Sequence, residues 1–575
     1  MMDADDRPAA STQRLAALAL MALVAGCSRP GEPAATGQPA APIAQSVEAA
    51  ASAIVTPEVA AAVRAATAGA TSEGPGIAWR QPAGTADMDA LLAESRSAGK
   101  PVFLYWGAVW CPPCNQVKAT VFKQAEFIEK SRGFIPVYLD GDSPGAQKLG
   151  ERFKVRGYPT MVLLRPDGGE LTRLPGEVDA RKYLQVLDLG LRSTRPLHEV
   201  LALAQSAPAT LSPADWRLLA YYAWDTDEQT LVPKAQLART LDALAAACPP
   251  AEAGPHARFA LKAMAAKAEA APDAKTRAAA ALEQARAVLA SEALLRDNLD
   301  IVSHQARELV AWLTAPNSDE RQALIAQWGA TLDRLTADRK LSQGDRAAAL
   351  IGRVQLARLD AGAGEKGPVQ LNEVVQAHVK REAARFDAEV GDADERQSVI
   401  PSAAYALAQA GLLDAADELL LRELDRSHSP YYAMLSLASN AKQRGDKAAA
   451  LDWHRRAYEA AKGMATRVQW GSGYVQALVE LAPRDAPRIR QAALAVLGEL
   501  DGQRDAFYER TARALDRMSA KLVAWPREAD ERAVLQQLRA RRDALCVALP
   551  DGDPQRRSCE ALFDQPAARR KGAAA

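Results

Sequence analysis

The stretch Trp110-Cys111-Pro112-Pro113-Cys114 contains two cysteines separated by two residues. This C-x-x-C spacing serves three kinds of chemistry, because it can supply half of a zinc site, attach a haem, or form and break a disulfide. The neighbouring residues, and the segments that must position the pair, decide among the three.

The segment from 77 to 192 alternates between strand and helix patterns. The apolar run from Pro101 to Gly107 has the length of a buried strand, and the cysteine pair follows directly after it. Around this strand we expect a strand at 76–80, a helix from 85 that stops at Gly99, a helix at 115–131, a strand at 134–140, a helix at 143–155, a hairpin at 160–174 with its turn at 166–169, and a helix at 179–191.

This order of elements, with a C-x-x-C between a strand and a helix, resembles the thioredoxin fold over residues 77–192. Two motifs carry the resemblance: the cysteine motif, and Gly157-Tyr158-Pro159-Thr160, whose proline follows Cys114 by 45 residues (159 − 114). In this family a cis-proline faces the cysteine pair, and the resemblance assigns that place to Pro159. It implies a thiol–disulfide oxidoreductase without a cofactor, in which Trp110, Tyr158 and Pro159 contact the substrate.

The neighbouring residues exclude the other two chemistries. Haem attachment needs a histidine directly after the second cysteine, and Asn115 occupies that position. A four-cysteine zinc site needs a second pair, which the sequence does not provide nearby, so we expect no metal. A purely structural disulfide between positions 111 and 114 remains the alternative interpretation.

The predicted catalytic residues are Cys111 and Cys114. Cys111 lies where the following helix should begin, and a helix N-terminus favours a thiolate, so we expect Cys111 to attack a substrate disulfide and Cys114 to resolve the mixed disulfide. Pro112 and Pro113 donate no amide hydrogen bond to the Cys111 sulfur, which favours a reductant over a strong oxidant. Many thioredoxins bury an aspartate where this chain has Tyr105, so the proton acceptor for Cys114 is either another carboxylate, with Asp140 and Asp142 as candidates, or water. This interpretation places the pair exposed at the tip of its helix.

The N-terminus indicates the compartment. The apolar run at 15–26 is too short to span a bilayer and suits a signal-peptide core, although three acidic residues in the leader depart from the usual positive charge. It ends in Leu-Val-Ala-Gly-Cys27, which resembles a bacterial lipobox. The resemblance implies a signal peptide at 1–26, lipidation of Cys27 and, because Ser28 follows instead of aspartate, a periplasmic protein anchored to the outer membrane. The Ala/Pro-rich residues 27–76 suit a flexible tether.

From residue 193 to the end, apolar residues recur at helical spacing. Gly411 and Gly445, like Ala416 and Ala450, are 34 residues apart, which is the period of tetratricopeptide repeats. We therefore expect an all-α helical-repeat region at 193–575, with tetratricopeptide-like units near 397–462. Such a region either binds proteins or only orients the redox domain, and no aromatic or basic stripe in the sequence marks a groove.

The remaining cysteines suggest one structural disulfide. Cys546 and Cys559 flank the segment 550–554, which lies between two helical stretches, and an oxidising compartment favours a bond between them. Cys248, which precedes a proline, is then left as a buried or idle thiol.

The composition sets limits on function. A chain of 575 residues is too long for one core, and 71 basic residues balance 71 acidic ones, so nucleic acid is not an expected partner. We expect a thiol–disulfide oxidoreductase of the cell envelope that reduces or isomerises disulfides in exported proteins and receives electrons from a membrane thiol–disulfide donor. The alternative is an envelope interaction scaffold that uses its helical repeats.

Overall fold

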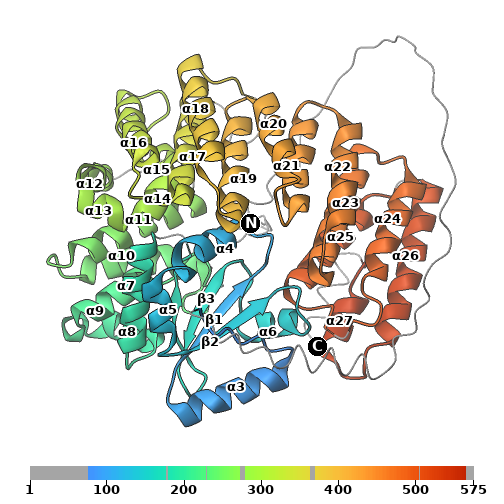
Figure 1. Cartoon of the computed structure of the whole chain (residues 1–575), viewed down its shortest axis with the longest axis horizontal. Helices are drawn as coiled ribbons and strands as arrows, with labels where there is room; N and C mark the ends of the chain where they lie inside the picture. The colour runs from blue at the N-terminus through green and yellow to red at the C-terminus, as the bar shows by residue number, and fades with distance from the viewer. Residues whose placement is uncertain are drawn as a thin grey trace, which may run out of the picture.

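The computed structural model describes residues 76–564, except 177–178, 228–229, 272–278, 363–368, 504 and 527. The predicted signal peptide, Cys27 and all of the predicted tether but Gly76 lie outside the described residues. The described part consists of an α/β unit and an all-helical region that curves around it (Figure 1). Within it, no helix combines the length and the apolar character that crossing a membrane requires.

Four strands of the α/β unit form one mixed sheet in the order β2-β1-β3-β4. The central strand β1 (Val102–Gly107) is parallel to β2 (Ile135–Asp140) and antiparallel to β3 (Thr160–Leu164), which pairs in turn with β4 (Glu170–Leu174). All residues of β1 are buried, as a central strand covered on both faces requires. The expected fold class, a thioredoxin-type sheet followed by an all-helical region, is confirmed.

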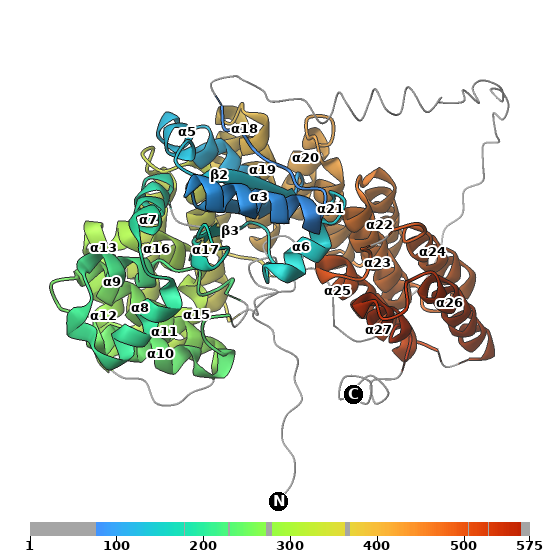
Figure 2. The same ribbon diagram turned by 90° about the horizontal axis from the view of Figure 1, so that it is seen from below.

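Helices flank this sheet, and α3 lies on its outer side, away from the helical arc (Figures 1 and 2). Their bounds are α3 (Thr85–Ala98), α4 (Pro112–Val117), the π-helix η1 (Lys118–Phe122), α5 (Ala125–Ser131), α6 (Ala146–Arg152) and α7 (Ala180–Arg192). The predicted strand at 76–80 is reduced to one bridge, between Arg80 and Val137. Pro82, two residues after Arg80, has no amide hydrogen with which to extend a ladder.

The helix predicted at 115–131 is interrupted instead of continuous. After η1 the backbone of Gln124 is extended, and α5 then starts a new helix. Residues five apart on one helix point about 140° apart, yet Phe122 and Phe127 both pack on Phe103, with ring centroids 6.3 and 5.6 Å away. The interruption allows both rings to enter the same core, which explains why periodicity alone missed it.

The all-helical region begins at Leu197. Its helices are α8 (Leu197–Ser206), the 3-10 turn η2 (Pro208–Thr210), α9 (Pro213–Ala220), α10 (Lys234–Ala247), α11 (Ala253–Ala270), α12 (Ala279–Ala290), α13 (Glu292–Asp297), α14 (Leu299–His304), α15 (Ala306–Leu313), α16 (Asp319–Ala337), α17 (Gln343–Asp360), α18 (Glu373–Glu389), α19 (Ala393–Gln409), α20 (Leu413–Glu423), α21 (Pro430–Gln443), α22 (Lys447–Ala460), α23 (Met464–Leu481), α24 (Ala486–Gly498), α25 (Glu509–Ala524), α26 (Ala529–Val547) and α27 (Pro554–Glu560).

Two helical hairpins lie where the 34-residue period was found. Gly411 joins α19 to α20 with a φ of 83°, and Gly445 joins α21 to α22 with a φ of 80°. Only glycine adopts this left-handed backbone without strain, which is a physical reason for its recurrence at both turns. The assignment of these hairpins to the tetratricopeptide family stays a prediction.

The α/β unit and the C-terminal helices share one hydrophobic core. A single cluster of buried side chains includes Phe103 and Leu163 of the sheet together with Trp470 of α23 and Leu515 of α25. The helical region therefore packs against the α/β unit through apolar side chains. The domain boundary between 192 and 193 falls between α7 and α8 and stays a prediction.

Cys546 of α26 and Cys559 of α27 form a disulfide, with 1.96 Å between the sulfurs. The bond closes a loop with a sequence separation of 13 residues, and closing a loop of that size stabilises a fold by about 3 kcal/mol. We expect the Cys546→Ala/Cys559→Ala variant to unfold at a lower urea concentration than the wild type. Equal midpoints, under oxidising conditions, would show that the disulfide does not contribute to stability.

Candidate active site

Cys111 is the N-cap residue of α4. Pro112 and Pro113 occupy the first two helical positions, so Cys114 is the first helical residue that has an amide hydrogen. That N–H donates to the Cys111 Sγ over 3.2 Å, and the two cysteines form a disulfide. The start of α4 thus offers one amide hydrogen bond to the sulfur that is expected to react.

The buried side chain of Asn115 fixes the turn that carries Cys111. Its amide donates to the backbone oxygens of Val109, over 2.8 Å, and Cys111, over 2.9 Å. Asn115 occupies the position at which a haem-binding histidine would stand, and these two hydrogen bonds give it a structural role. Among the described residues, no group of three or more histidine, cysteine, aspartate or glutamate side chains is placed to bind a metal ion.

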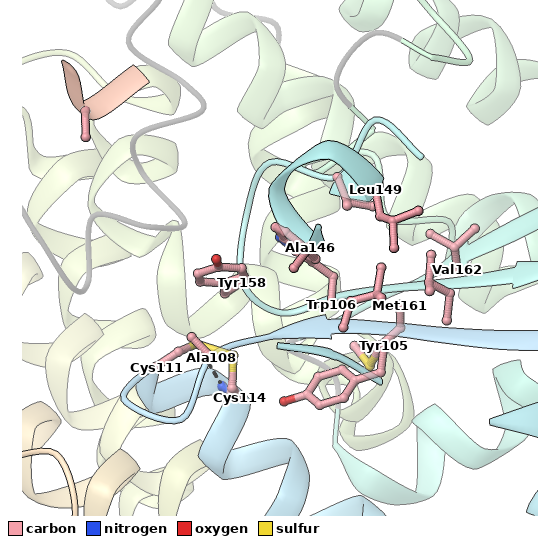
Figure 3. Close-up of a cluster of buried hydrophobic side chains, with 14 of the residues drawn as sticks. Tyr105, Trp106, Ala108, Cys111, Cys114, Ala146, Leu149, Tyr158, Met161 and Val162 are labelled. Carbon is pink, nitrogen blue, oxygen red and sulfur yellow. Dashed lines mark hydrogen bonds between the residues drawn. A yellow bond between two sulfur atoms is a disulfide. The ribbon is translucent and has the colours of Figure 1, made fainter. Parts of the chain in front are cut away.

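The Tyr158–Pro159 peptide bond is cis and directly precedes β3. Thr160, the first residue of β3, pairs in register with Trp106 near the end of β1, so both motifs lie at one end of the sheet. The rings of Trp110 and Tyr158 are 5.9 Å apart in an edge-to-face arrangement. In the view of Figure 3, the Tyr158 ring lies above the Cys111–Cys114 disulfide and the Tyr105 ring lies to its right.

Tyr105, which stands where many thioredoxins have an aspartate, is buried against Tyr138, with ring centroids 5.0 Å apart. Its hydroxyl has no hydrogen-bond partner among the described residues. Burial, followed by the negative charges of Asp140 and Asp394, raises the pKa of Tyr105 far above its usual value. A neutral phenol of this kind does not accept the proton of Cys114, so the proton acceptor stays unassigned.

Comparison with known proteins identifies the α/β unit. A family model described as a thioredoxin-like domain matches residues 88–190. The thioredoxin H-type of Oryza sativa subsp. indica is 32% identical over 90 residues, which are 16% of this chain and 69% of that protein. The chain belongs to the thioredoxin family. Its thioredoxin domain is also 36% identical over 104 residues to the thiol:disulfide interchange protein DsbD of Pseudomonas fluorescens, and 32% identical over 106 residues to DsbD 1 of Pseudomonas aeruginosa.

The DsbD matches cover 18% of each relative and 17% or 18% of this chain. The chain thus spans less than a fifth of the length of these relatives. The thioredoxin-like family model ends at residue 190, before the helical region begins. At the level of the domain, the thioredoxin fold, the relatives and the Cys111–Cys114 pair support a thiol–disulfide oxidoreductase.

The expectation that the thioredoxin cysteine pair is exposed is wrong in this structure. Cys111 is 2% exposed, Cys114 is 0% exposed, and Trp110 is 3% exposed. The helical region covers the pair: Gln397 of α19 donates to the Trp110 backbone oxygen over 3.4 Å, and His428 donates to the Val109 backbone oxygen over 3.0 Å. The residues of the motif could be predicted from the sequence, but the residues that pack on them could not.

Sequence reasoning also missed the aromatic and cationic side chains that meet the thioredoxin motif. Trp110 lies against Trp470 of α23, with ring centroids 4.6 Å apart, and is stacked on Tyr432 of α21 at 6.1 Å. The guanidinium of Arg510 lies 4.2 Å from the Tyr158 ring. These residues come from separate helices, so no linear stripe could have revealed them.

Cys248, at the end of α10, is a free, buried thiol. Burial and the nearby Glu252 raise its pKa to about 11. It is therefore protonated and unreactive at neutral pH.

Proposed function

We propose that this protein is a thiol–disulfide oxidoreductase of the cell envelope that reduces or isomerises disulfides in exported proteins. The observation that carries the proposal is the placement of the Cys111–Cys114 disulfide at the N-terminus of α4, with the Cys114 N–H on the Cys111 sulfur and the cis Tyr158–Pro159 bond at the same end of the sheet. The similarity of the domain to proteins named thiol:disulfide interchange protein supports the same chemistry.

In the proposed reaction the reduced protein acts through Cys111. Its thiolate attacks one sulfur of a client disulfide, forms a mixed disulfide and releases the other client sulfur as a thiolate that takes up a proton. The Cys114 thiolate then attacks the Cys111 sulfur and releases the second client thiol. Two electrons have passed to the client, and the Cys111–Cys114 disulfide must be reduced again by a thiol donor.

The proposed location rests on sequence features. The lipobox-like segment ending at Cys27 supports a lipid anchor facing the periplasm, and Ser28 supports the outer membrane. The relatives named DsbD support a membrane thiol–disulfide protein as the electron donor and exported proteins as the clients.

The second candidate function is an interaction scaffold, in which the 111–114 disulfide is structural. One specific observation favours it: both cysteines are buried beneath the helical region. Both functions use the same fold, so the redox behaviour of the pair decides between them.

The reduction potential of the 111–114 disulfide distinguishes these candidates. We expect a value between about −270 mV, typical of a reductant, and about −180 mV, typical of an isomerase, because a single amide hydrogen bond supports the Cys111 thiolate. The measurement equilibrates the full chain in thiol buffers, alkylates free thiols and quantifies the Cys111 peptide by mass spectrometry. A value below about −300 mV, characteristic of structural disulfides, would contradict the proposed function and favour the scaffold.

A further inference from the structure

The helical region contacts the two aromatic side chains that are expected to bind clients. The Trp110 indole N–H donates to Thr466 Oγ1 over 2.8 Å, and Trp110 also packs on Tyr432 and Trp470. Arg510 covers the face of the Tyr158 ring. A client protein would need the surface that these helices already occupy.

A carboxylate of the thioredoxin domain caps helix α23 of the helical region. The N-cap residue of α23, Gly463, has no side chain, and the Thr466 N–H in the first turn donates to Asp142 Oδ1 over 2.7 Å. The Thr466 hydroxyl donates to Asp142 Oδ2 over 2.5 Å while it accepts from Trp110. A carboxylate at a helix N-terminus satisfies free amides and complements the helix dipole. Thr466 thus connects the cap of α23 to the indole beside Cys111.

The backbone conformation of Gly463 allows Asp142 to approach the start of α23 closely. Gly463 has a φ of 82°, and a Cβ atom built there would lie 2.3 Å from the Asp142 carboxylate carbon. Only glycine combines this backbone with so close an approach. Helix α23 therefore contacts the thioredoxin domain at one specific position, where Gly463 meets Asp142.

The same contact partly buries two charged groups. Arg510 has no ion-pair partner among the described residues; its guanidinium donates to Gln469 Oε1 over 2.9 Å and lies on the Tyr158 and Trp110 rings. Asp142 is likewise only partly exposed, and its carboxylate accepts both hydrogen bonds from Thr466. Partial burial of a charge without an ion pair is unfavourable, and opening the contact would expose both groups further.

We propose that helices α21, α23 and α25, together with His428 in the segment just before α21, form an autoinhibitory cap, which blocks clients from the Cys111–Cys114 pair until the Asp142–Thr466–Trp110 contact opens. The inference rests on the proposed redox function. In the closed state the cap occupies the client surface, and the pair is inaccessible. In the open state Trp110, Tyr158 and Cys111 become free to meet a client together.

The test compares full-length variants by the rate at which dithiothreitol reduces the 111–114 disulfide. Dithiothreitol attacks the Cys111 sulfur and releases the Cys114 thiolate, and its second thiol then releases Cys111 and closes the oxidised ring. Timed alkylation and peptide mapping follow Cys111 separately from the other cysteines. Thr466→Val removes two hydrogen bonds, one of them to a charged group, and we expect it to accelerate the reduction about tenfold.

Two further variants keep the outcome interpretable. Thr336→Val in α16 is the matched control, because the Thr336 hydroxyl is buried but bonds only to Leu332 of its own helix. The 111–114 disulfide of this variant should be reduced at the same rate as in the wild type. His428→Ala removes the contact with Val109 from an exposed position and should accelerate reduction several-fold even if Thr466→Val fails to fold.

The outcomes separate the cap from the proposed function. A wild-type rate equal to that of the urea-unfolded chain, or folded Thr466→Val and His428→Ala variants that react no faster than wild type, would overturn the cap. Faster reduction of Thr466→Val, without any gain in insulin reduction, would support the cap and contradict the client-reducing activity.

Discussion

Insulin reduction by dithiothreitol is expected to be accelerated by the wild-type protein and to fall to the rate of dithiothreitol alone in a Cys111→Ser variant. A serine hydroxyl neither ionises at neutral pH nor forms a disulfide, so the whole catalysed rate should be lost. The measurement is the initial rate of insulin precipitation, with the protein at substoichiometric concentration. Because the cap restricts access, the same comparison should also be made in the Thr466→Val background, where we expect the larger catalysed rate.

Cys114→Ser is the matched control for this experiment. This variant keeps the attacking thiol but lacks the group that resolves the mixed disulfide, so turnover should stop while a covalent adduct between Cys111 and insulin accumulates. Mass spectrometry of non-reduced peptides detects the adduct. If Cys111→Ser kept the wild-type rate, or if the adduct formed through Cys248 instead, the assignment of Cys111 as nucleophile would be wrong.

The second large effect is expected from pH. Burial, offset in part by the Thr466 hydrogen bonds, raises the pKa of Asp142 in the closed state to about 6 from a usual value of 3.8. A group whose pKa is higher in the closed state binds its proton more tightly there. Closure is therefore favoured most below the usual pKa of 3.8 and is weakened as pH rises from there through about 6. The charged groups that act on Asp142 are Asp140, which raises its pKa, and Arg510, which lowers it. The full shift corresponds to at most about a hundredfold change in opening.

The experiment measures the reduction of the 111–114 disulfide by a phosphine between pH 4 and pH 8. Each wild-type rate is divided by the rate of Asp142→Asn, in which position 142 cannot ionise but still accepts the Thr466 N–H. We expect this ratio to rise severalfold between about pH 4 and pH 6 and to level off above pH 6. Asp345, a second buried carboxylate near the thioredoxin domain, is present in both proteins, so its titration cancels. A ratio that does not change with pH would exclude Asp142 as the titrating group.

Local patterns were sufficient to predict the thioredoxin fold and its reactive motif. The buried strand before Cys111, the hairpin after Pro159 and the helix that stops at Gly99 depend on apolar runs, turn residues and the backbone freedom of glycine, all of which are visible within a few residues. The interruption between η1 and α5 was not predicted, because the packing of Phe122 and Phe127 on Phe103 decided it.

The sequence by itself determined which atoms can react: two cysteines at the start of a helix, with prolines that leave a single amide near the sulfur. The tertiary structure alone decided whether those atoms are accessible. The Trp110–Thr466 contact joins residues 356 positions apart, and Tyr432, Trp470 and Arg510 converge on it from three helices. Such contacts depend on how distant helices pack in space, which no local pattern of residue types encodes.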